Sequence, residues 1–438
     1  MTKNNSLLEK CHDPRQDDGD RFVGIKHKDG DIHVYFPLGY KLSNNDNEVR
    51  KDIIHLLNIL HKFDKKERVI PIKKYDKTQS VFPLNAYLEV IRYYMENGYY
   101  IETEPVYKTR DRGKINWPKT IKNQKPTLQK NSKGLYVPVY TDFTVRESNP
   151  NDNKEITYIN QLCVYESFEK LGWIFTSYMP PKPAGYKETK RNAEEYNENK
   201  GKPDNRSQTK RFLIILQKKL SNTNNDKKKI LFQSMIDMLK YMEFNSDINN
   251  FFFGTETFEN IWEKLIDEAF GIKDKDQYFP RTEWHLLYGK DKNFKPLEPD
   301  TIMIYEDKIY VIDAKYYRYG KTGNPDHLPP TSSISKQITY GEYVKEKEGK
   351  DPFNAFLMPY NMKDNPFGLD EEFATIGEAI SKWKSESEDN QYNHIQGILV
   401  DTRFLLHNYE NRNHISKLAE AIKDSCKKNK HISKHINI

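Results

Sequence analysis

The sequence predicts an α+β or α/β fold built around a mixed β-sheet, and three observations support this prediction. Aromatic residues make up 13% of the 438 residues and supply bulky apolar side chains for a core, so the chain is not disordered throughout. Apolar residues recur with helical spacing in some segments and form short extended runs in others. After about residue 250 these two kinds of segment alternate, as they do where helices flank a mixed sheet.

The first part of the chain combines a hairpin with helices. Two extended runs, Phe22–Ile25 and Ile32–Phe36, flank the polar turn Lys28–Asp31, which is a hairpin pattern. We therefore expect residues 1–181 to form an N-terminal α+β region. The other elements expected there are three helices at 47–63, 82–98 and 159–171, and extended stretches near 100–108 and 135–146.

Residues 182–210 are expected to form a polar linker, because they are rich in Lys, Glu, Asn and Gly. Residues 211–438 then form a helical segment followed by a second domain. The helices expected in this part lie at 208–221, 227–243, 257–270, 333–347, 372–384 and 413–426, and the extended elements are a stretch at 283–288, a hairpin at 300–315 and strands at 353–358 and 395–401.

Composition excludes several classes of protein. No apolar run approaches the roughly 20 residues of a membrane span, and the first ten residues lack the apolar core of a secretion signal. We therefore expect a cytoplasmic protein with no membrane partner. The three cysteines, Cys11, Cys163 and Cys426, are far apart and form no CxxC pair, so neither a zinc site nor a disulfide framework is expected.

Two further features bear on ligands. The GxxxxGK[ST] phosphate loop is absent, so the chain is not expected to be a P-loop nucleotide hydrolase. The net charge is +6, from 70 basic and 64 acidic side chains. Such a balance is compatible with a polyanionic partner, but the abundance of Lys, Asn, Ile and Tyr is equally typical of an AT-rich genome.

Candidate catalytic residues gather in one predicted hairpin. If Glu306 and Asp307 form its two-residue turn, Asp300 and Asp313 face each other across the two strands. Lys315 lies two residues beyond Asp313, so it shares that face. The pattern predicts two carboxylates and one amine at the open end of the hairpin, above an apolar floor of Ile302, Ile304, Ile309 and Val311.

This trio suits metal-assisted hydrolysis of a phosphodiester. Two carboxylates at one place repel each other unless a cation neutralises them, and Mg²⁺ prefers oxygen ligands. We expect Asp300, Asp313 and the backbone carbonyl of Ala314 to bind it, and Lys315 to hold the attacking hydroxide or the developing phosphate charge. A chance arrangement is the alternative, because Asp, Glu and Lys are common in this chain.

Two helices could complete the site. Glu259 and Glu263 lie one helical turn apart beside an apolar stripe, and Glu263 is the preferred additional metal ligand. Lys336 and Gln337 lie near the start of a later helix, where they could contact DNA phosphate or the active-site water. In the alternative interpretation these four residues are ordinary polar groups on helix surfaces.

The order of these motifs resembles the PD-(D/E)xK nuclease superfamily: a helical Glu, then Pro-Asp, then Asp-Ala-Lys, then Lys-Gln. More specifically, several segments spread over most of the chain resemble the LlaJI family of restriction endonucleases. These segments are Asp13–Arg15, Phe22–Gly24, Phe253–Thr255, Phe258-Glu259, Trp262-Glu263 and Leu328–Gln337. The stretch Arg112–Trp117 also resembles a signature of McrC-type subunits.

The resemblance implies a PD-(D/E)xK nuclease domain at the C-terminus that cleaves both strands of DNA at specific sequences with Mg²⁺. Asp300, Asp313 and Lys315 would be its catalytic core, with Glu263 assisting and Gln337 accessory. The family belongs to restriction–modification systems, so a cognate DNA methyltransferase is implied. A possible partner is an McrB-like AAA+ GTPase, with which the missing phosphate loop agrees.

Two alternatives remain open at this stage. The protein could be a non-catalytic or partner-activated McrC-like subunit of an AAA+ GTPase complex, or a repair nuclease that recognises DNA structure. Residues 1–181 would serve DNA recognition or partner docking, although no superfamily motif lies there.

DNA contact requires basic groups near phosphates, and several clusters are candidates, with a solvated surface as the alternative for each. Basic residues around Trp117 lie in a predicted loop, interleaved with aromatic residues. The candidates are Lys108, Arg110, Arg112, Lys114, Lys119 and Lys122 near Trp117, Lys336 on the helix, and Lys187, Lys190 and Arg191 in the linker.

Overall fold

The computed structural model describes residues 7–12, 21–28, 31–67, 82–151, 154–176, 178–184, 205–244, 251–290, 292–382 and 390–436. The chain forms two compact units. Unit 1 joins Met1–Thr78 to Asn249–Ile438, and unit 2 is Gln79–Ile248. These units do not follow the expected boundaries at residues 181 and 210, because the N-terminal hairpin pairs with a strand that follows unit 2 in the sequence.

The linker prediction can be compared with the structure only at its ends. Residues 185–204 lie outside the described residues, and so do Lys187, Lys190 and Arg191. At the C-terminal end, helix α5 already begins at Asn205, before the expected start at 208. The segment Asp13–Arg15 also lies outside the described residues.

A four-stranded sheet holds the N-terminal part in unit 1. The expected hairpin forms from β2 and β3, which are antiparallel, and β8 adds to the other edge of β2. Gly24 and Gly254 face each other across β2 and β8, and a Cβ on Gly24 would lie 2.2 Å from the carbonyl oxygen of Phe253. The sheet order is β1-β3-β2-β8, with β1 Cys11–His12, β2 Val23–Lys28, β3 Asp31–Tyr35 and β8 Phe251–Thr255.

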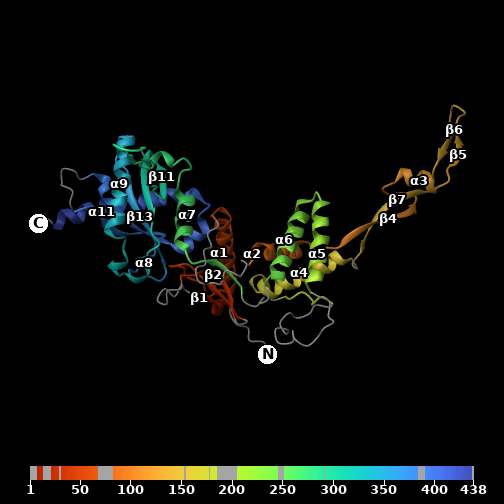
Figure 1. The fold of residues 1–438 in the computed structure, drawn as a ribbon, viewed down its shortest axis with the longest axis horizontal. Helices are drawn as coiled ribbons and strands as arrows, with labels where there is room; N and C mark the ends of the chain where they lie inside the picture. Colours follow the sequence, from red (N-terminus) through yellow and green to blue (C-terminus); the bar gives the residue numbers. More distant parts are fainter. Residues whose placement is uncertain are drawn as a thin grey trace. The chain divides into compact units, whose positions relative to one another are not determined.

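A second, five-stranded sheet forms the core of unit 1 (Figure 1). Strands β12, β13 and β15 are parallel to one another, and antiparallel strands β11 and β14 close the two edges. The fold thus combines helices with a mixed β-sheet and is of the α+β class, as the sequence predicts. The order is β11-β12-β13-β15-β14, with β11 Thr301–Tyr305, β12 Lys308–Ala314, β13 Phe353–Tyr360, β14 Phe373–Ala379 and β15 Ile395–Asp401.

Helices cover both faces of this sheet. On one face, α9 (Thr331–Glu348) packs Tyr340 and Val344 against Ile302 and Val311. Because side chains alternate along a strand, Thr375 projects from the other face, where it donates a hydrogen bond to Ser425 of α11 (Ile415–Ile436).

The segment 372–384, predicted to be a helix, is instead edge strand β14. Its apolar residues have helical spacing, but pairing with β15 overrides that local preference. Phe373 packs edge-on against Phe270 and Phe404, and a β-bulge lies between Thr375 and Gly377, where Gly377 has φ +118°. Tertiary packing therefore decides this element.

Unit 2 consists of helices and an extended arm. The helices are α2 Leu84–Asn97, α4 Glu155–Leu171, α5 Asn205–Ser221 and α6 Asp226–Phe244. The arm, residues 102–151, begins as the antiparallel ribbon of β4 and β7 and continues to the hairpin of β5 and β6 (Figure 1). Its elements are β4 Glu102–Arg110, α3 Trp117–Asn123, β5 Thr127–Lys130, β6 Tyr136–Val139 and β7 Phe143–Asn151.

Two short elements of the arm, α3 and β5, were not expected from the sequence. The other helices and strands are α1 Asp46–Glu67, α7 Phe258–Phe270, β9 Glu283–Trp284, β10 Lys292–Asn293, α8 Tyr319–Thr322, α10 Thr402–Asn408, and the 3₁₀ turns η1 Leu7–Lys10, η3 Gly172–Ile174, η6 Asp276–Tyr278, η7 Pro325–His327, η9 Gln391–Asn393 and η10 Arg412–His414. Of the helices in the described ranges, none has the length and apolar character needed to cross a membrane.

Candidate active site

The β11–β12 hairpin has the register that the sequence predicts. Ile302 pairs with Val311 and Tyr305 with Lys308. Glu306 and Asp307 both have positive φ, +49° and +58°, as a two-residue type I′ turn requires. The apolar floor is only partly covered, because Ile302 and Val311 are buried whereas Ile304 is 42% exposed.

The predicted trio converges at the open end of this hairpin. Asp300 directly precedes β11, and its Oδ2 accepts a hydrogen bond of 2.8 Å from the backbone N–H of Ala314. The carboxyl groups of Asp300 and Asp313 are hydrogen-bonded to each other. Lys315 Nζ lies 2.6 Å from Asp313 Oδ2, and the two side chains are 18% and 3% exposed. The structure thus brings the two acids and the amine into one contact cluster.

Burial and like charge determine the protonation of this cluster. Burial, with the neighbouring charge of Asp313, raises the pKa of Asp300 to about 8. Burial lowers the pKa of the Lys315 amine, but the carboxylates of Asp313 and Asp300 outweigh burial, so this pKa is raised. At neutral pH and without a cation, a proton is therefore retained on the acidic pair while Lys315 stays charged.

Glu263 on α7 lies close enough to interact electrostatically with the trio. Burial raises its pKa, the charge of Lys315 opposes that change, and the charge of Asp313 adds to it. Within the described parts of the chain, however, no three acidic, His or Cys side chains are grouped as a ready metal cage. The close pair is thus Asp300 and Asp313, with Glu263 outside it.

Gln337 is a structural link in this arrangement. Its side chain is fully buried, and Nε2 donates a hydrogen bond of 2.8 Å to the carbonyl oxygen of Val311. The backbone carbonyl oxygen of Gln337 accepts a hydrogen bond of 3.0 Å from Nδ2 of Asn354. The side chain therefore ties α9 to β12. Lys336 is exposed, with Nζ 5.4 Å from the ring centre of Tyr340.

Two residues beside the trio were not singled out from the sequence. Burial raises the pKa of the Tyr340 hydroxyl, and the charges of Asp313 and Asp300 add to this. The hydroxyl donates a hydrogen bond to the carbonyl oxygen of Glu298. Lys275 donates to the backbone oxygen of Asp300 and forms an ion pair of 2.7 Å with Asp267. The spacing of Tyr340 from Gln337, about one helical turn, was the only sequence signal.

The candidate DNA-binding residues near Trp117 belong to unit 2, whereas the trio belongs to unit 1. Arg110 on β4 forms an ion pair with Glu147, and the amine of Lys119 on α3 lies over the ring of Tyr107. Among the described residues no ion pair is formed by Arg112 or Lys114, both exposed in the loop before α3.

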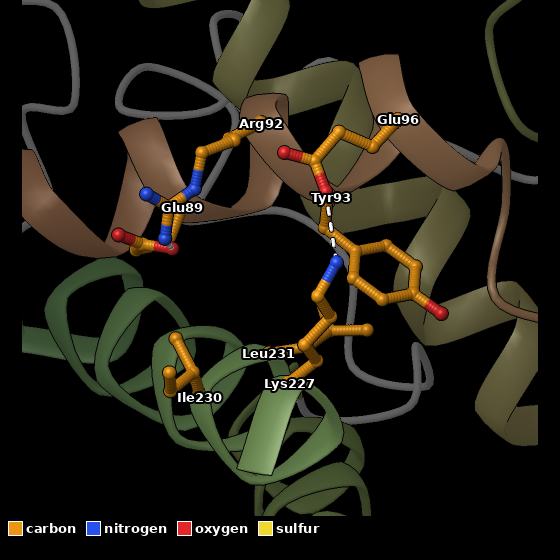
Figure 2. Close-up of a pocket in the computed structure, with 7 residues that line it drawn as sticks. All are labelled: Glu89, Arg92, Tyr93, Glu96, Lys227, Ile230 and Leu231. Carbon is orange, nitrogen blue, oxygen red and sulfur yellow. Dashed lines mark hydrogen bonds and ion pairs between the residues drawn. The ribbon is translucent and has the colours of Figure 1, made fainter. Parts of the chain in front are cut away.

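A pocket of about 260 Å³ also lies in unit 2, between α2 and α6 (Figure 2). Its charged groups are already paired, Arg92 with Glu89 and Lys227 with Glu96. The pocket therefore offers no evident charge for a ligand. It is lined by Glu89, Arg92, Tyr93, Glu96, Lys227, Ile230 and Leu231.

Comparison with protein families gives a match over most of the chain. The model of the LlaJI restriction endonuclease family matches residues 22–376. The Type II restriction enzyme BsuMI component YdjA of Bacillus subtilis (strain 168) is 29% identical over 126 residues, which are 26% of this chain and 27% of that protein. The match thus spans about a quarter of the length of that relative.

The chain also aligns with solved structures. One of them is the half-complex from a tetradecameric assembly of Thermococcus gammatolerans McrB AAA+ hexamers with bound McrC. The alignment covers 90% of this chain and 82% of the other, with 12% identity and a TM-score of 0.30. A TM-score of this size does not establish a shared fold.

Proposed function

Because the chain belongs to the LlaJI restriction endonuclease family, we propose that it is a Mg²⁺-dependent, site-specific type II nuclease that cuts both strands of DNA. We assign the five-stranded sheet and its helices to a PD-(D/E)xK nuclease core. The observation that carries this proposal is the cluster in unit 1, where Lys315 contacts Asp313 and the carboxyl groups of Asp313 and Asp300 are hydrogen-bonded.

The residues at this place fit Mg²⁺. Two carboxylates are a common protein contribution to a Mg²⁺ site, with water and phosphate supplying the other ligands. The N–H of Ala314 points toward Asp300, and in a strand the C=O of a residue points to the same side as its N–H, so this carbonyl is available as a third oxygen. When bound, Mg²⁺ would acidify a water molecule and offset charge on a phosphoryl oxygen.

The protein side chains have distinct tasks in this proposal. Asp300 and Asp313 hold the cation, and Asp313 also orients Lys315 through the 2.6 Å ion pair. Lys315 is charged at neutral pH because its pKa is raised by the two carboxylates. It therefore acts as a cation that stabilises the hydroxide or the phosphate charge in the transition state, and not as a base. Glu263 assists from α7.

The arm favours a second task for the protein, which is docking to a partner. Leu128, Leu135 and Tyr136 at its end are each more than 60% exposed, and exposed apolar groups of this kind mark interaction sites. We propose an McrB-like AAA+ GTPase as that partner, and a cognate methyltransferase as the companion activity in the same restriction–modification system.

Cleavage of unmethylated plasmid DNA tests the nuclease proposal. Wild-type protein with Mg²⁺, alone and with the candidate GTPase and GTP, is expected to give discrete fragments, and chelation of Mg²⁺ is expected to stop cleavage. Asp313→Asn is expected to lower the rate at least about 100-fold, because it removes a metal ligand and the partner of Lys315. Asp326→Asn is the matched control, since it neutralises an exposed carboxylate in another loop.

The same assay separates the competing functions. Binding without cutting, unchanged by Asp313→Asn and by addition of the GTPase, would assign the protein to a non-catalytic assembly role. Cutting of branched or nicked DNA alone would assign it to repair. Discrete fragments from linear duplex DNA that disappear in Asp313→Asn, but not in Asp326→Asn, are the result that the proposal requires.

A further inference from the structure

An exposed hairpin directly precedes the acidic cluster in the sequence. Strands β9 and β10 pair as Trp284 with Lys292 and Glu283 with Asn293, and we call residues 281–297 the β9–β10 hairpin. Its loop carries Leu287 and Tyr288, which are 94% and 91% exposed, and Trp284 on β9 is 63% exposed. Large apolar side chains so fully exposed at a hairpin tip are unusual on a surface without a binding role.

Basic groups flank these apolar side chains. Arg281, Lys290, Lys292 and Lys295 lie in the same 17 residues, against the acids Glu283 and Asp291. Glu283 is within 2.9 Å of His285, and the side chain of Asp291 lies outside the described residues. The amine of Lys292 lies 5.2 Å from the ring centre of Phe294. The hairpin thus presents apolar and cationic groups together.

The root of the hairpin is fixed beside the proposed active site. Just before it, Tyr278 is buried in a cluster with Val311 and Tyr340. Just after it, the carbonyl oxygen of Glu298 accepts a hydrogen bond of 2.9 Å from Tyr340. Leu297 N–H bonds to the carbonyl oxygen of Pro280 and closes the root. Val311 and Asp313 project from the same face of β12, so the hairpin is anchored on the face that carries the trio.

Chain length limits how far the hairpin lies from that site. Asn293 on β10 is seven residues before Asp300, so at most about 25 Å separates them. One turn of B-form DNA is about 34 Å long. Tyr288 at the tip is 12 residues before Asp300, so at most about 43 Å separates them. The tip is therefore within reach of a duplex whose scissile phosphate lies at the acidic cluster, within about one and a half helical turns of the cut.

We propose that the β9–β10 hairpin is a DNA wedge: Leu287 and Tyr288 insert between base pairs from the minor groove, close to the cut, while Lys290 and Lys292 contact the flanking phosphates. This proposal rests on the proposed nuclease function. Apolar side chains such as Leu commonly part base steps in this way, and an aromatic ring stacks on any base. The wedge would kink the duplex and set which strand segment meets the trio.

A second copy of this chain could also bind the exposed tip of the hairpin. The charges of the hairpin favour DNA instead. The cores of protein–protein interfaces are depleted of Lys, whereas this hairpin carries Lys290, Lys292 and Lys295 after its apolar tip and Arg281 before it. Gly289 has φ +108° and nothing lies within 4 Å of where its Cβ would be. The space beside Gly289 at the tip is therefore open, as insertion into a groove of DNA requires.

The test compares the double variant Leu287→Ser/Tyr288→Ser with Ile380→Ser, which changes another exposed apolar residue of unit 1. For cleavage assays, both changes are made in the wild-type protein. For binding assays, both are made in the Asp313→Asn variant. The probe is duplex DNA containing a cut site mapped with the wild-type protein, with 2-aminopurine at each step within about one and a half turns of the cut. Unstacking of a step raises 2-aminopurine fluorescence.

We expect a fluorescence rise at one or two steps with Asp313→Asn alone and with added Ile380→Ser, and no rise with the hairpin variant. Its cleavage rate at saturating DNA should fall at least about tenfold. In a separate measurement, Lys290→Ala/Lys292→Ala should reduce the slope of log affinity against log salt by about 2.

Other outcomes would overturn the wedge. An unchanged fluorescence rise and cleavage rate in the hairpin variant would remove it while leaving the nuclease proposal intact. Loss of self-association of the hairpin variant in sedimentation, with the fluorescence rise retained, would assign the hairpin to contact between two copies. Absence of any cleavage by the wild-type protein would instead contradict the nuclease proposal itself. In that case the fluorescence measurement, made with random duplex DNA, would still report whether the hairpin unstacks bases.

Discussion

The β11–β12 hairpin and the arm are both antiparallel ribbons, but only the first has its faces covered. In β11–β12, Ile302, Val311 and Asp313 are buried beneath α9. In the β5–β6 hairpin at the end of the arm, Leu128 and Tyr136 are more than 60% exposed. An isolated two-stranded ribbon is marginally stable in water. The covered ribbon can therefore hold buried charge in place, whereas the arm is shaped for contact with something else.

Each ribbon departs from the usual rule that charged groups are exposed and apolar groups are buried, and the two depart in opposite ways. The covered ribbon buries charged groups, which is costly unless they are paired or neutralised. The arm exposes apolar groups, which is costly unless a partner covers them. Each departure identifies a candidate functional surface, one for a cation and phosphate and one for a macromolecule. Predictions that act on one ribbon and spare the other can test this contrast.

The largest pH-dependent effect on stability is expected at Asp300. Its pKa of about 8 in the folded protein lies above its ordinary value of 3.8, so the folded protein holds a proton that the unfolded chain releases. Without a divalent cation, stability should therefore fall as pH rises from about 4 to about 8. Asp300→Asn removes this penalty and should stabilise the metal-free protein by about 2 kcal/mol at pH 9, after allowance for partial solvent access, and by little at pH 4.

Thermal unfolding with chelator at several pH values measures this difference. Addition of about 10 mM Mg²⁺ should reverse the order of stability of the two proteins, since the ion stabilises the state that it binds. The melting temperature of the wild type should therefore rise more than that of Asp300→Asn. The control is Asp326→Asn, an exposed carboxylate that should follow wild type at each pH. Equal melting shifts with Mg²⁺ in wild type and in Asp300→Asn would show that Asp300 does not hold the cation.

A smaller effect on stability is expected at Gln337, and this substitution is not expected to change the reaction directly. Gln337→Ala removes the buried hydrogen bond to Val311 and leaves that carbonyl without this donor, which should destabilise unit 1 by about 1–2 kcal/mol. The neighbouring control, Lys336→Ala, changes an exposed side chain and should stay within about 0.5 kcal/mol. Denaturant unfolding measures both variants. If Gln337→Ala instead abolishes cleavage at an unchanged stability, Gln337 acts on the reaction.

The covered ribbon could be predicted from sequence because several local signals agree there. A polar pair, Glu306 and Asp307, lies between two β-rich runs, and alternation then placed Asp300, Asp313 and Lys315 on one face. The register follows from the turn. The role of Gln337 could not be predicted, since only the packed position of α9 shows that its amide is used by a strand backbone.

Elements that depend on distant partners were harder to predict. The segment containing Phe373 has helical spacing, and pairing with β15 makes it a strand. The two units differ from the expected boundaries because β2 pairs with β8, more than 200 residues away, and no local signal encodes that pairing. Strands β5 and β6 at the end of the arm have four residues each and are almost wholly exposed, so alternation there carries no information about a covered face.

The smallest effect on stability is expected in the arm. Leu128→Ser and Tyr136→Ser alter side chains that are already exposed, so the free energy of unfolding should change by no more than about 0.5 kcal/mol. The matched change Ile302→Ser in the covered ribbon should cost about 3 kcal/mol, because it removes buried apolar area and leaves a buried hydroxyl. Denaturant unfolding compares the three variants. A large loss of stability in the arm variants would mean that the apolar groups of the arm are covered within this chain, and the case for a docked partner would fail. An unchanged stability combined with weaker binding of the GTPase is the result that the exposed ribbon predicts.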